Sequence, residues 1–113
     1  MSAHPSEVLV AYVTVPSREF AESIGTSLVE SGDAACVNVL PQVTSFFKWQ
    51  GKFERYQEYV MILKTTREAY ARMQSRILDL HPSDNPCILA LPVADGSPAF
   101  LDWVEQATQV RNG

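Results

Sequence analysis

Cysteine, charge and long hydrophobic runs are all scarce in this sequence, and each shortage excludes a class of protein. The two cysteines, Cys36 and Cys87, are too few for a secreted disulfide framework and fit a reducing cytoplasm. No stretch approaches the roughly 20 apolar residues of a membrane span, and residues 1–6 lack the basic residues that begin a signal peptide. Only 19% of the residues are charged and the net charge is -4, which argues against a nucleic-acid partner. We therefore expect a cytoplasmic protein that binds neither membranes nor nucleic acids.

The common signatures of catalysis are also missing. The sequence contains no Gly-rich phosphate loop, no G-x-S-x-G nucleophile motif, no paired histidines and no C-x-x-C. Its 13 carboxylates fall mostly on predicted helix surfaces, and no spacing forces two of them together. The sequence therefore predicts that the protein is not an enzyme.

The 113 residues instead have the composition of one globular domain, with 46% hydrophobic residues. Hydrophobic periodicity and the placing of Gly and Pro predict strands that alternate with helices. The order β-α-β-β-α-β-α indicates an α+β fold, a ferredoxin-like sandwich with a long central hairpin and an extra C-terminal helix. We divide this single domain into a flexible tail (1–6), a folded core (7–107) and a flexible or assembly-dependent tail (108–113).

Three local patterns make this fold prediction testable. The β-branched run Val8–Val15 is typical of a central strand covered on both faces, and Cys87–Leu91 is typical of a buried strand. Gly32 is expected to end the first helix in a left-handed conformation. Thr65 and Glu68 have the spacing of a capping box at the start of the second helix.

The hairpin predicted around Gln50-Gly51 is too long to fit within its own domain. Each arm has about 14 residues and spans roughly 46 Å, whereas a compact domain of this length has a radius of gyration of roughly 13 Å. The tip must project, or the first arm must bend at Pro41; the alternative is a hairpin folded back onto its own sheet. Both faces carry aromatic rings, which we expect to be buried between subunits: Phe46, Phe47, Trp49, Phe53 and Tyr56.

Several separate motifs, in order and between residue 8 and about residue 107, resemble the CutA (divalent-cation tolerance) family. They are Ala35-Cys36-Val37-Asn38, Val43-Thr44-Ser45, Trp49-Gln50-Gly51-Lys52, Ile62-Leu63-Lys64-Thr65, His81-Pro82, Leu89-Ala90-Leu91-Pro92 and Gly96-Ser97-Pro98. The resemblance implies a ferredoxin-like domain that assembles into a very stable homotrimer through its long strands. It also implies a role in tolerance of copper and other divalent cations, without an established catalytic reaction.

The resemblance links Cys36 and His81 to copper or to a cleft between subunits. Ser83 and Cys87 depart from the family, which commonly has Tyr and Glu at these positions, and Cys87 could add a thiolate that suits Cu(I). Thiolate and imidazole ligands fit copper first, and zinc or another divalent cation second, with no obligatory cofactor. The alternative is structural: both cysteines pack as small residues, and His81 serves the C-terminal end of a helix.

Two further features could also bind a ligand. Asn38 and Lys64 are polar residues in apolar strands, and they either line this cleft or point outward at a sheet edge. Removal of Met1 would leave Ser2-Ala3-His4, which offers a square-planar nitrogen set for Cu(II) or Ni(II).

Three functions stay open at this level. The first is a trimeric divalent-cation tolerance protein that binds copper. The second is a signalling trimer that binds a small-molecule effector, as in the PII nitrogen-signalling proteins, which share the ferredoxin-like trimer. The third is a structural trimer that positions other proteins.

Overall fold

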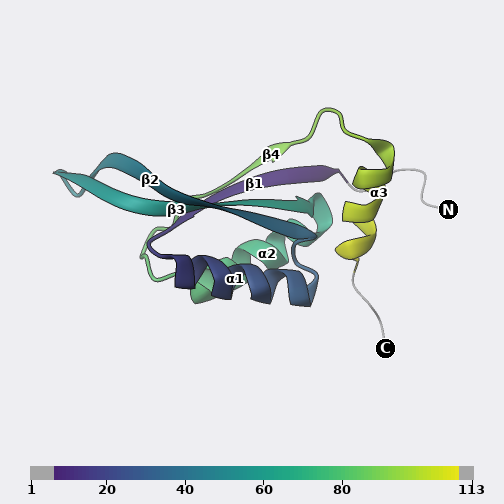
Figure 1. The fold of residues 1–113 in the computed structure, drawn as a ribbon, viewed down its shortest axis with the longest axis horizontal. Coiled ribbons are helices and arrows are strands. Elements are labelled where there is room, and N and C mark those ends of the chain that lie inside the picture. The colour runs from purple at the N-terminus through teal and green to yellow at the C-terminus, as the bar shows by residue number, and fades with distance from the viewer. Residues whose placement is uncertain (1–6, 110–113) are drawn as a thin grey trace.

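The computed structural model describes residues 7–109, which form one four-stranded antiparallel sheet and three helices. Helices α1 and α2 lie on one face of the sheet, and α3 packs at the end of the sheet away from the hairpin tip (Figure 1). The strand order is β2-β3-β1-β4, so β2 and β4 are the edges, and the arrangement is the predicted α+β fold. The elements in chain order are β1 (Val8–Val15), α1 (Arg18–Ser31), β2 (Cys36–Trp49), β3 (Lys52–Thr66), α2 (Arg67–Leu80), β4 (Ile88–Pro92) and α3 (Pro98–Ala107).

The ends of α1 are set by a hydroxyl and a glycine. Ser17 begins the helix by accepting a hydrogen bond from the Phe20 N–H at 3.3 Å. Gly32 ends it with a φ of 78°, and its N–H donates to the carbonyls of Leu28 and Val29. The predicted left-handed end of this helix is confirmed.

Helix α2 begins one residue later than predicted. Its N-cap is Thr66, whose hydroxyl accepts a hydrogen bond from the Ala69 N–H at 3.3 Å. The expected capping box on Thr65 is wrong, because the Thr65 hydroxyl is buried and donates to the Asp33 carbonyl at 2.7 Å. Thr65 therefore ties the end of β3 to the loop after α1 and is not free to cap.

The β2–β3 hairpin projects from the sheet. Its turn, Gln50–Gly51, has φ angles of 52° and 80°, the left-handed values of the predicted two-residue turn. Strand β1 reaches only residues 59–66 of β3, so residues 43–49 and 52–58 extend beyond β1 by about 23 Å. The molecule is accordingly 52 Å long, with a radius of gyration of 15.1 Å. The alternative of a hairpin folded back onto its own sheet is wrong.

A β-bulge at Pro41–Gln42 decides which face of the hairpin each aromatic ring occupies. Between Leu40 and Val43 the first arm advances three residues, while its partner advances two, from Val60 to Glu58. The φ of Gln42, 34°, marks the extra residue. Because side chains alternate along a strand, this residue moves every later side chain of β2 to the opposite face.

The rings of the hairpin consequently divide into two pairs. Phe47 and Tyr56 contact each other at a centroid distance of 5.6 Å on the face that points away from α1 and α2, which we call the open face. Trp49 shares this face with Phe47. Phe46 and Phe53, with ring centroids 6.2 Å apart, lie on the opposite face. Both faces carry rings, as the sequence predicts.

The helix-covered face of the sheet holds the main core of the single chain, whereas much of the open face is exposed. The core between this face and the two helices consists of Ala11, Val13, Val15, Ala21, Ile24, Leu28, Ala34, Met61, Leu63, Met73 and Ile77. On the open face, Tyr12 is 39% exposed, Leu89 60% and Leu91 65%. The prediction of a buried final strand is therefore wrong for the single chain, because both helices lie on the same side. Strand β1 is central, as predicted, and all of its residues except Val10 and Tyr12 are buried.

The described core ends just beyond α3. Thr108, where the sequence predicts the C-terminal tail to begin, is buried; its hydroxyl donates to the Val104 carbonyl at 3.0 Å and lies 3.3 Å from the Thr66 hydroxyl. The predicted tails 1–6 and 110–113, and with them the nitrogen set of Ser2-Ala3-His4, lie outside the described residues. No helix within residues 7–109 is long and apolar enough to cross a membrane.

A buried carboxylate holds the helices together. The side chain of Asp33, just after α1, is 4% exposed, and Arg72 and Arg76 of α2 donate to its two oxygens at 3.2 and 2.6 Å. Arg72 also donates to the Thr108 carbonyl at 3.1 Å. Burial raises the pKa of Asp33, but side-chain hydrogen bonds from Arg76, Ser31 and Arg72 lower it more, so the pKa lies below its ordinary value of 3.8.

This arrangement predicts an acid-dependent stability. Asp33→Asn should lower the free energy of unfolding by about 1–3 kcal/mol at pH 7, because it removes the buried negative charge that pairs with two guanidinium groups. A carboxylate whose pKa is depressed by folding stabilises the protein above its ordinary pKa, and this contribution is lost as the pH falls through the lower, folded value. The gap between wild type and variant should therefore close below about pH 4.

Denaturant unfolding at one fixed protein concentration, at pH 7 and in a series down to about pH 2.5, measures this gap. Asp79→Asn, at an exposed position of α2, is the matched control and should stay close to wild type. An Asp33→Asn penalty that stays constant over the whole pH series would show that the charge of Asp33 does not contribute.

Candidate functional site

A cleft of about 760 Å³ lies on the open face, between the projecting hairpin and the turn that joins α2 to β4. One wall carries aromatic rings of the hairpin and Tyr12 of β1; the other wall is the turn itself, residues 81–87. The hairpin side also contributes Glu54, Glu58 and Lys48. The cleft therefore combines rings, carboxylates and the polar turn in one concave surface.

His81 fixes the turn to the sheet. Its Nε2 lies 2.7 Å from the Thr14 carbonyl oxygen, and the Ser83 N–H donates to its Nδ1 at 3.0 Å. Because a carbonyl can only accept and a backbone N–H can only donate, the imidazole carries its proton on Nε2 and none on Nδ1. Both ring nitrogens of this neutral imidazole therefore already have backbone partners. A metal ion could take Nδ1 only by displacing the Ser83 N–H.

The two positions at which the sequence departs from the expected pattern, Ser83 and Cys87, both line the cleft. The Ser83 hydroxyl accepts a hydrogen bond from the Asn85 N–H at 3.2 Å, which tightens the turn. Cys87 is a free, exposed thiol just before β4, and its predicted place inside a buried strand is wrong. Its thiol is accessible to a ligand in the cleft.

Cys36, Asn38 and Lys64 lie elsewhere, where β2 begins at the edge of the sheet. Cys36 is half-buried and pairs with Lys64 across the ladder, and the Lys64 ammonium donates to Asn38 Oδ1. None of the three lines the cleft. The structure thus brings His81 and Cys87 together and separates them from Cys36.

One chain does not offer a complete metal site among its described residues. Within residues 7–109, no three side chains of His, Cys, Asp and Glu lie close enough together to hold an ion. The cleft supplies one accessible thiol, Cys87, and one imidazole, His81, whose nitrogens are engaged. A closed site takes about four ligands. The ligand types in the cleft suit copper, but one chain supplies too few of them.

Glu54 and Glu58 are cleft residues that were not predicted from the sequence. Both are half-buried, and they flank Tyr56 at alternate positions of β3, so all three side chains share the open face. In the described part of the chain, neither carboxylate forms a salt bridge or a side-chain hydrogen bond. The sequence pattern Glu-x-Tyr-x-Glu on a predicted strand could have indicated that these three side chains share one face.

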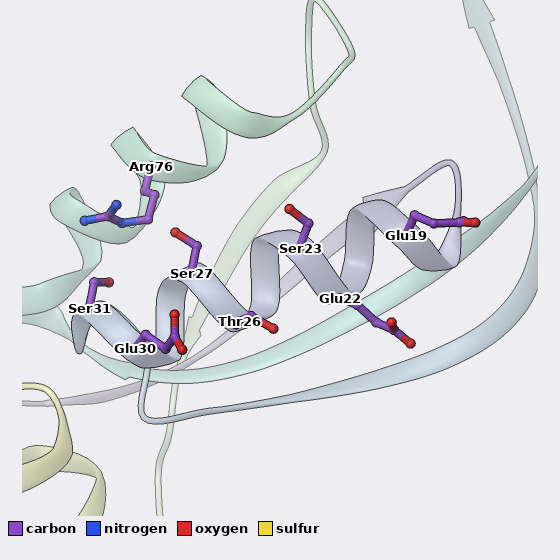
Figure 2. Close-up of a pocket in the computed structure, with 8 residues that line it drawn as sticks. All are labelled: Glu19, Glu22, Ser23, Thr26, Ser27, Glu30, Ser31 and Arg76. Atoms are coloured by element: carbon purple, nitrogen blue, oxygen red, sulfur yellow. The ribbon is translucent and has the colours of Figure 1, made fainter.

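A second hollow, of about 790 Å³, lies on the opposite side of the molecule. Figure 2 shows Ser23, Ser27 and Ser31 on the side of α1 that faces Arg76 of α2, with glutamates along the rest of the helix. Arg76 already binds Asp33, and no cysteine, histidine or aromatic ring lines this hollow. We therefore assign the candidate site to the cleft on the open face.

The comparisons with known proteins agree on one family. The family model of the CutA1 divalent ion tolerance protein matches residues 9–107. The divalent-cation tolerance protein CutA of Thermus thermophilus is 43% identical over 99 residues, which cover 88% of this chain and 96% of the relative. That of Archaeoglobus fulgidus is 42% identical over 98 residues, which cover 87% of this chain and 95% of the relative.

The solved structures agree with the sequences. The divalent cation tolerance protein Cut A1 from Thermus thermophilus matches the described fold with a TM-score of 0.88 at 42% identity. The match covers 90% of this chain and 99% of that one. The likeness therefore includes the long hairpin, the sheet and the helices together.

Proposed function

Because the chain belongs to the CutA1 divalent ion tolerance family, which is not a family of enzymes, we propose that it acts in divalent-cation tolerance as a cytoplasmic homotrimer that binds copper. The family match over residues 9–107 is the observation that carries this proposal. Zinc or another divalent cation is the second choice of ion, because thiolate and imidazole also suit zinc.

The uncovered apolar surface supports assembly. The open face exposes Leu89 and Leu91, and within residues 7–109 no strand pairs with the outer sides of the edge strands β2 and β4. An apolar sheet face with free edges invites aggregation unless another surface covers it. A closed three-fold assembly would cover the same surface on every copy. In this proposal the interface includes the ring residues Phe46, Phe47, Trp49, Phe53 and Tyr56.

The soft donors of the cleft support copper as the ion. Cys87 supplies an exposed thiol in the same cleft as His81, and thiolates select Cu(I) over hard cations. Since one chain offers too few ligands, a neighbouring subunit or water would complete the coordination. Cys36, Asn38 and Lys64 lie outside the cleft, so in this proposal they are not part of the same copper site.

The charges of the cleft argue against an anionic effector such as a nucleotide. Three carboxylates line it, from Glu54, Glu58 and Asp84, whereas Lys48 is the one cationic residue of the described lining. A phosphate group needs converging cations or backbone N–H groups. The cleft therefore suits a cation better than a phosphorylated ligand.

The assembly can be tested with one charge at the hairpin. Trp49→Asp should raise the dissociation constant of the trimer at least about tenfold, because burial of an unpaired carboxylate in an apolar contact costs about 1.4 kcal/mol or more. Sedimentation velocity over a range of protein concentrations gives this constant. Val29→Asp on the outer face of α1 is the matched control, since Val29 is 44% exposed and Trp49 42%. Wild-type protein that sediments as a monomer at micromolar concentration would refute the trimer.

Copper binding can be tested with the two cysteines of the chain. All variants carry His4→Ala, which removes any contribution of the N-terminal nitrogen set. Cys87→Ser should weaken Cu(I) binding by about 10–100-fold, and His81→Ala should weaken it less, because the His81 nitrogens are already engaged. Competition with a Cu(I) chelator under reducing conditions measures the affinity.

Cys36→Ser is the matched control of that copper titration and should leave the affinity unchanged. Loss of Cu(I) affinity in Cys36→Ser, with Cys87→Ser unaffected, would place the ion outside the cleft. Loss on His4→Ala alone would assign the copper to the N-terminal residues.

A further inference from the structure

The segment between β4 and α3 contains the sequence Asp95-Gly96, in which a carboxylate and the next backbone nitrogen are both unbound. Residues 93–97 belong to no helix or strand, and Asp95 and Gly96 are exposed. Within residues 7–109, the Asp95 carboxylate forms no salt bridge or hydrogen bond, and the Gly96 N–H has no acceptor. The side-chain carboxyl carbon and this nitrogen would close a five-membered ring if they joined.

The structure sets Asp95 apart from the other four aspartates of the sequence. The N–H after Asp33 donates to a carbonyl at 3.1 Å, and the N–H after Asp84 donates to a hydroxyl at 3.2 Å. Asp79 and Asp102 lie in α2 and α3, where each N–H bonds the carbonyl four residues earlier. Because such a bond holds the nitrogen in place, only the nitrogen after Asp95 is free to turn toward the preceding carboxyl group.

Glycine is needed at residue 96 because Leu101 of α3 packs against it. A Cβ at this position would lie 3.1 Å from Leu101 Cδ2, closer than ordinary van der Waals contact. The packing therefore keeps the residue after Asp95 without a side chain. This leaves the Gly96 nitrogen unshielded, on a backbone with the conformational freedom of glycine.

We propose that Asp95-Gly96 is a site of spontaneous isoaspartate formation. The Gly96 nitrogen gives up its proton and bonds to the side-chain carboxyl carbon of Asp95, and one carboxyl oxygen leaves as water. Water then opens the resulting succinimide ring at either carbonyl. Opening at the side-chain carbonyl restores aspartate, and opening at the main-chain carbonyl leaves the chain joined through the side chain. One water leaves and one returns, so the reaction needs no further reactant.

The altered linkage acts on α3. Isoaspartate adds one carbon–carbon bond, about 1.5 Å, to the backbone directly before this helix. Leu101, which fits against Gly96, also packs on the small core cluster that contains Val8 and Val104. Because closely packed contacts tolerate little displacement, the longer backbone should loosen α3 from the sheet.

Peptide mapping of the full-length protein after several weeks at body temperature and neutral pH tests the proposal. EDTA and a thiol reductant in the buffer exclude metal and cysteine chemistry. Fragmentation by electron transfer, which cleaves the Cα–Cβ bond of an isoaspartate, locates each modified residue. The yield at Asp95 should exceed that at each of the other four aspartates at least about tenfold, because only there are the reacting atoms free to meet.

Asp95→Glu is the diagnostic variant, because it keeps both the charge and Gly96. Its side chain is one methylene longer, so ring closure must fix one more rotatable bond and should be at least about tenfold slower. Asp79→Glu, at an exposed position of α2, is the matched control and should leave the yield at Asp95 unchanged.

Hydrogen exchange measures the effect on α3. In the isomerised fraction, separated by chromatography, the amides of residues 101–107 should exchange at least about fivefold faster than in fresh protein. The amides of α1 should exchange at the same rate in both.

Three outcomes would overturn this proposal. The first is an isoaspartate yield at Asp95 no higher than at the other aspartates. The second is an equal yield of isomer at residue 95 in wild type and Asp95→Glu. The third is unchanged exchange of α3 in the isomerised fraction, which would show that the altered linkage does not reach the helix. Neither a failed copper titration nor a monomer in sedimentation changes these results.

Discussion

The position of both long helices on the same face of the sheet is the constraint on which the rest of this structure depends. On the covered face, β1 and β3 bury an apolar core against α1 and α2. On the open face the described chain leaves Leu89 and Leu91 exposed. The projecting half of the hairpin has no sheet neighbour either. The proposed assembly and the candidate site both arise from this one uncovered surface.

The cleft takes its chemistry from two local features. The bulge at Pro41–Gln42 turns Phe47 toward the open face, beside Glu54 and Tyr56 of the partner strand. Across the cleft, His81 ties the turn before β4 to β1 through the Thr14 carbonyl. Carboxylates, rings and one free thiol then line a single concave surface, in which the thiol is the donor that best suits a soft metal ion.

Much of the fold could be predicted from the sequence, because it is encoded locally. Gly32 and the Gln50–Gly51 turn each need a left-handed backbone, and both adopt it. The start of α2 was missed by one residue, since Thr65 and Thr66 are chemically alike and only the tertiary contact of Thr65 with Asp33 separates their roles. The apolar strand β4 looked buried, because a strand that needs a partner molecule has the same composition as one covered by its own chain.

The candidate site was less predictable, for a geometric reason. The extra residue at Pro41–Gln42 reverses the alternation of β2, so counting along β2 from its start would place Phe46 and Phe47 on the wrong faces, whereas pairing back from the Gln50–Gly51 turn places them correctly. Hydrogen exchange of the hairpin amides in the wild-type protein tests the central claim, that assembly covers the open face and its edges. The account predicts that residues 43–49 and 52–58 exchange as slowly as the central strand β1. Rapid exchange of these residues, at concentrations where β1 stays protected, would contradict it.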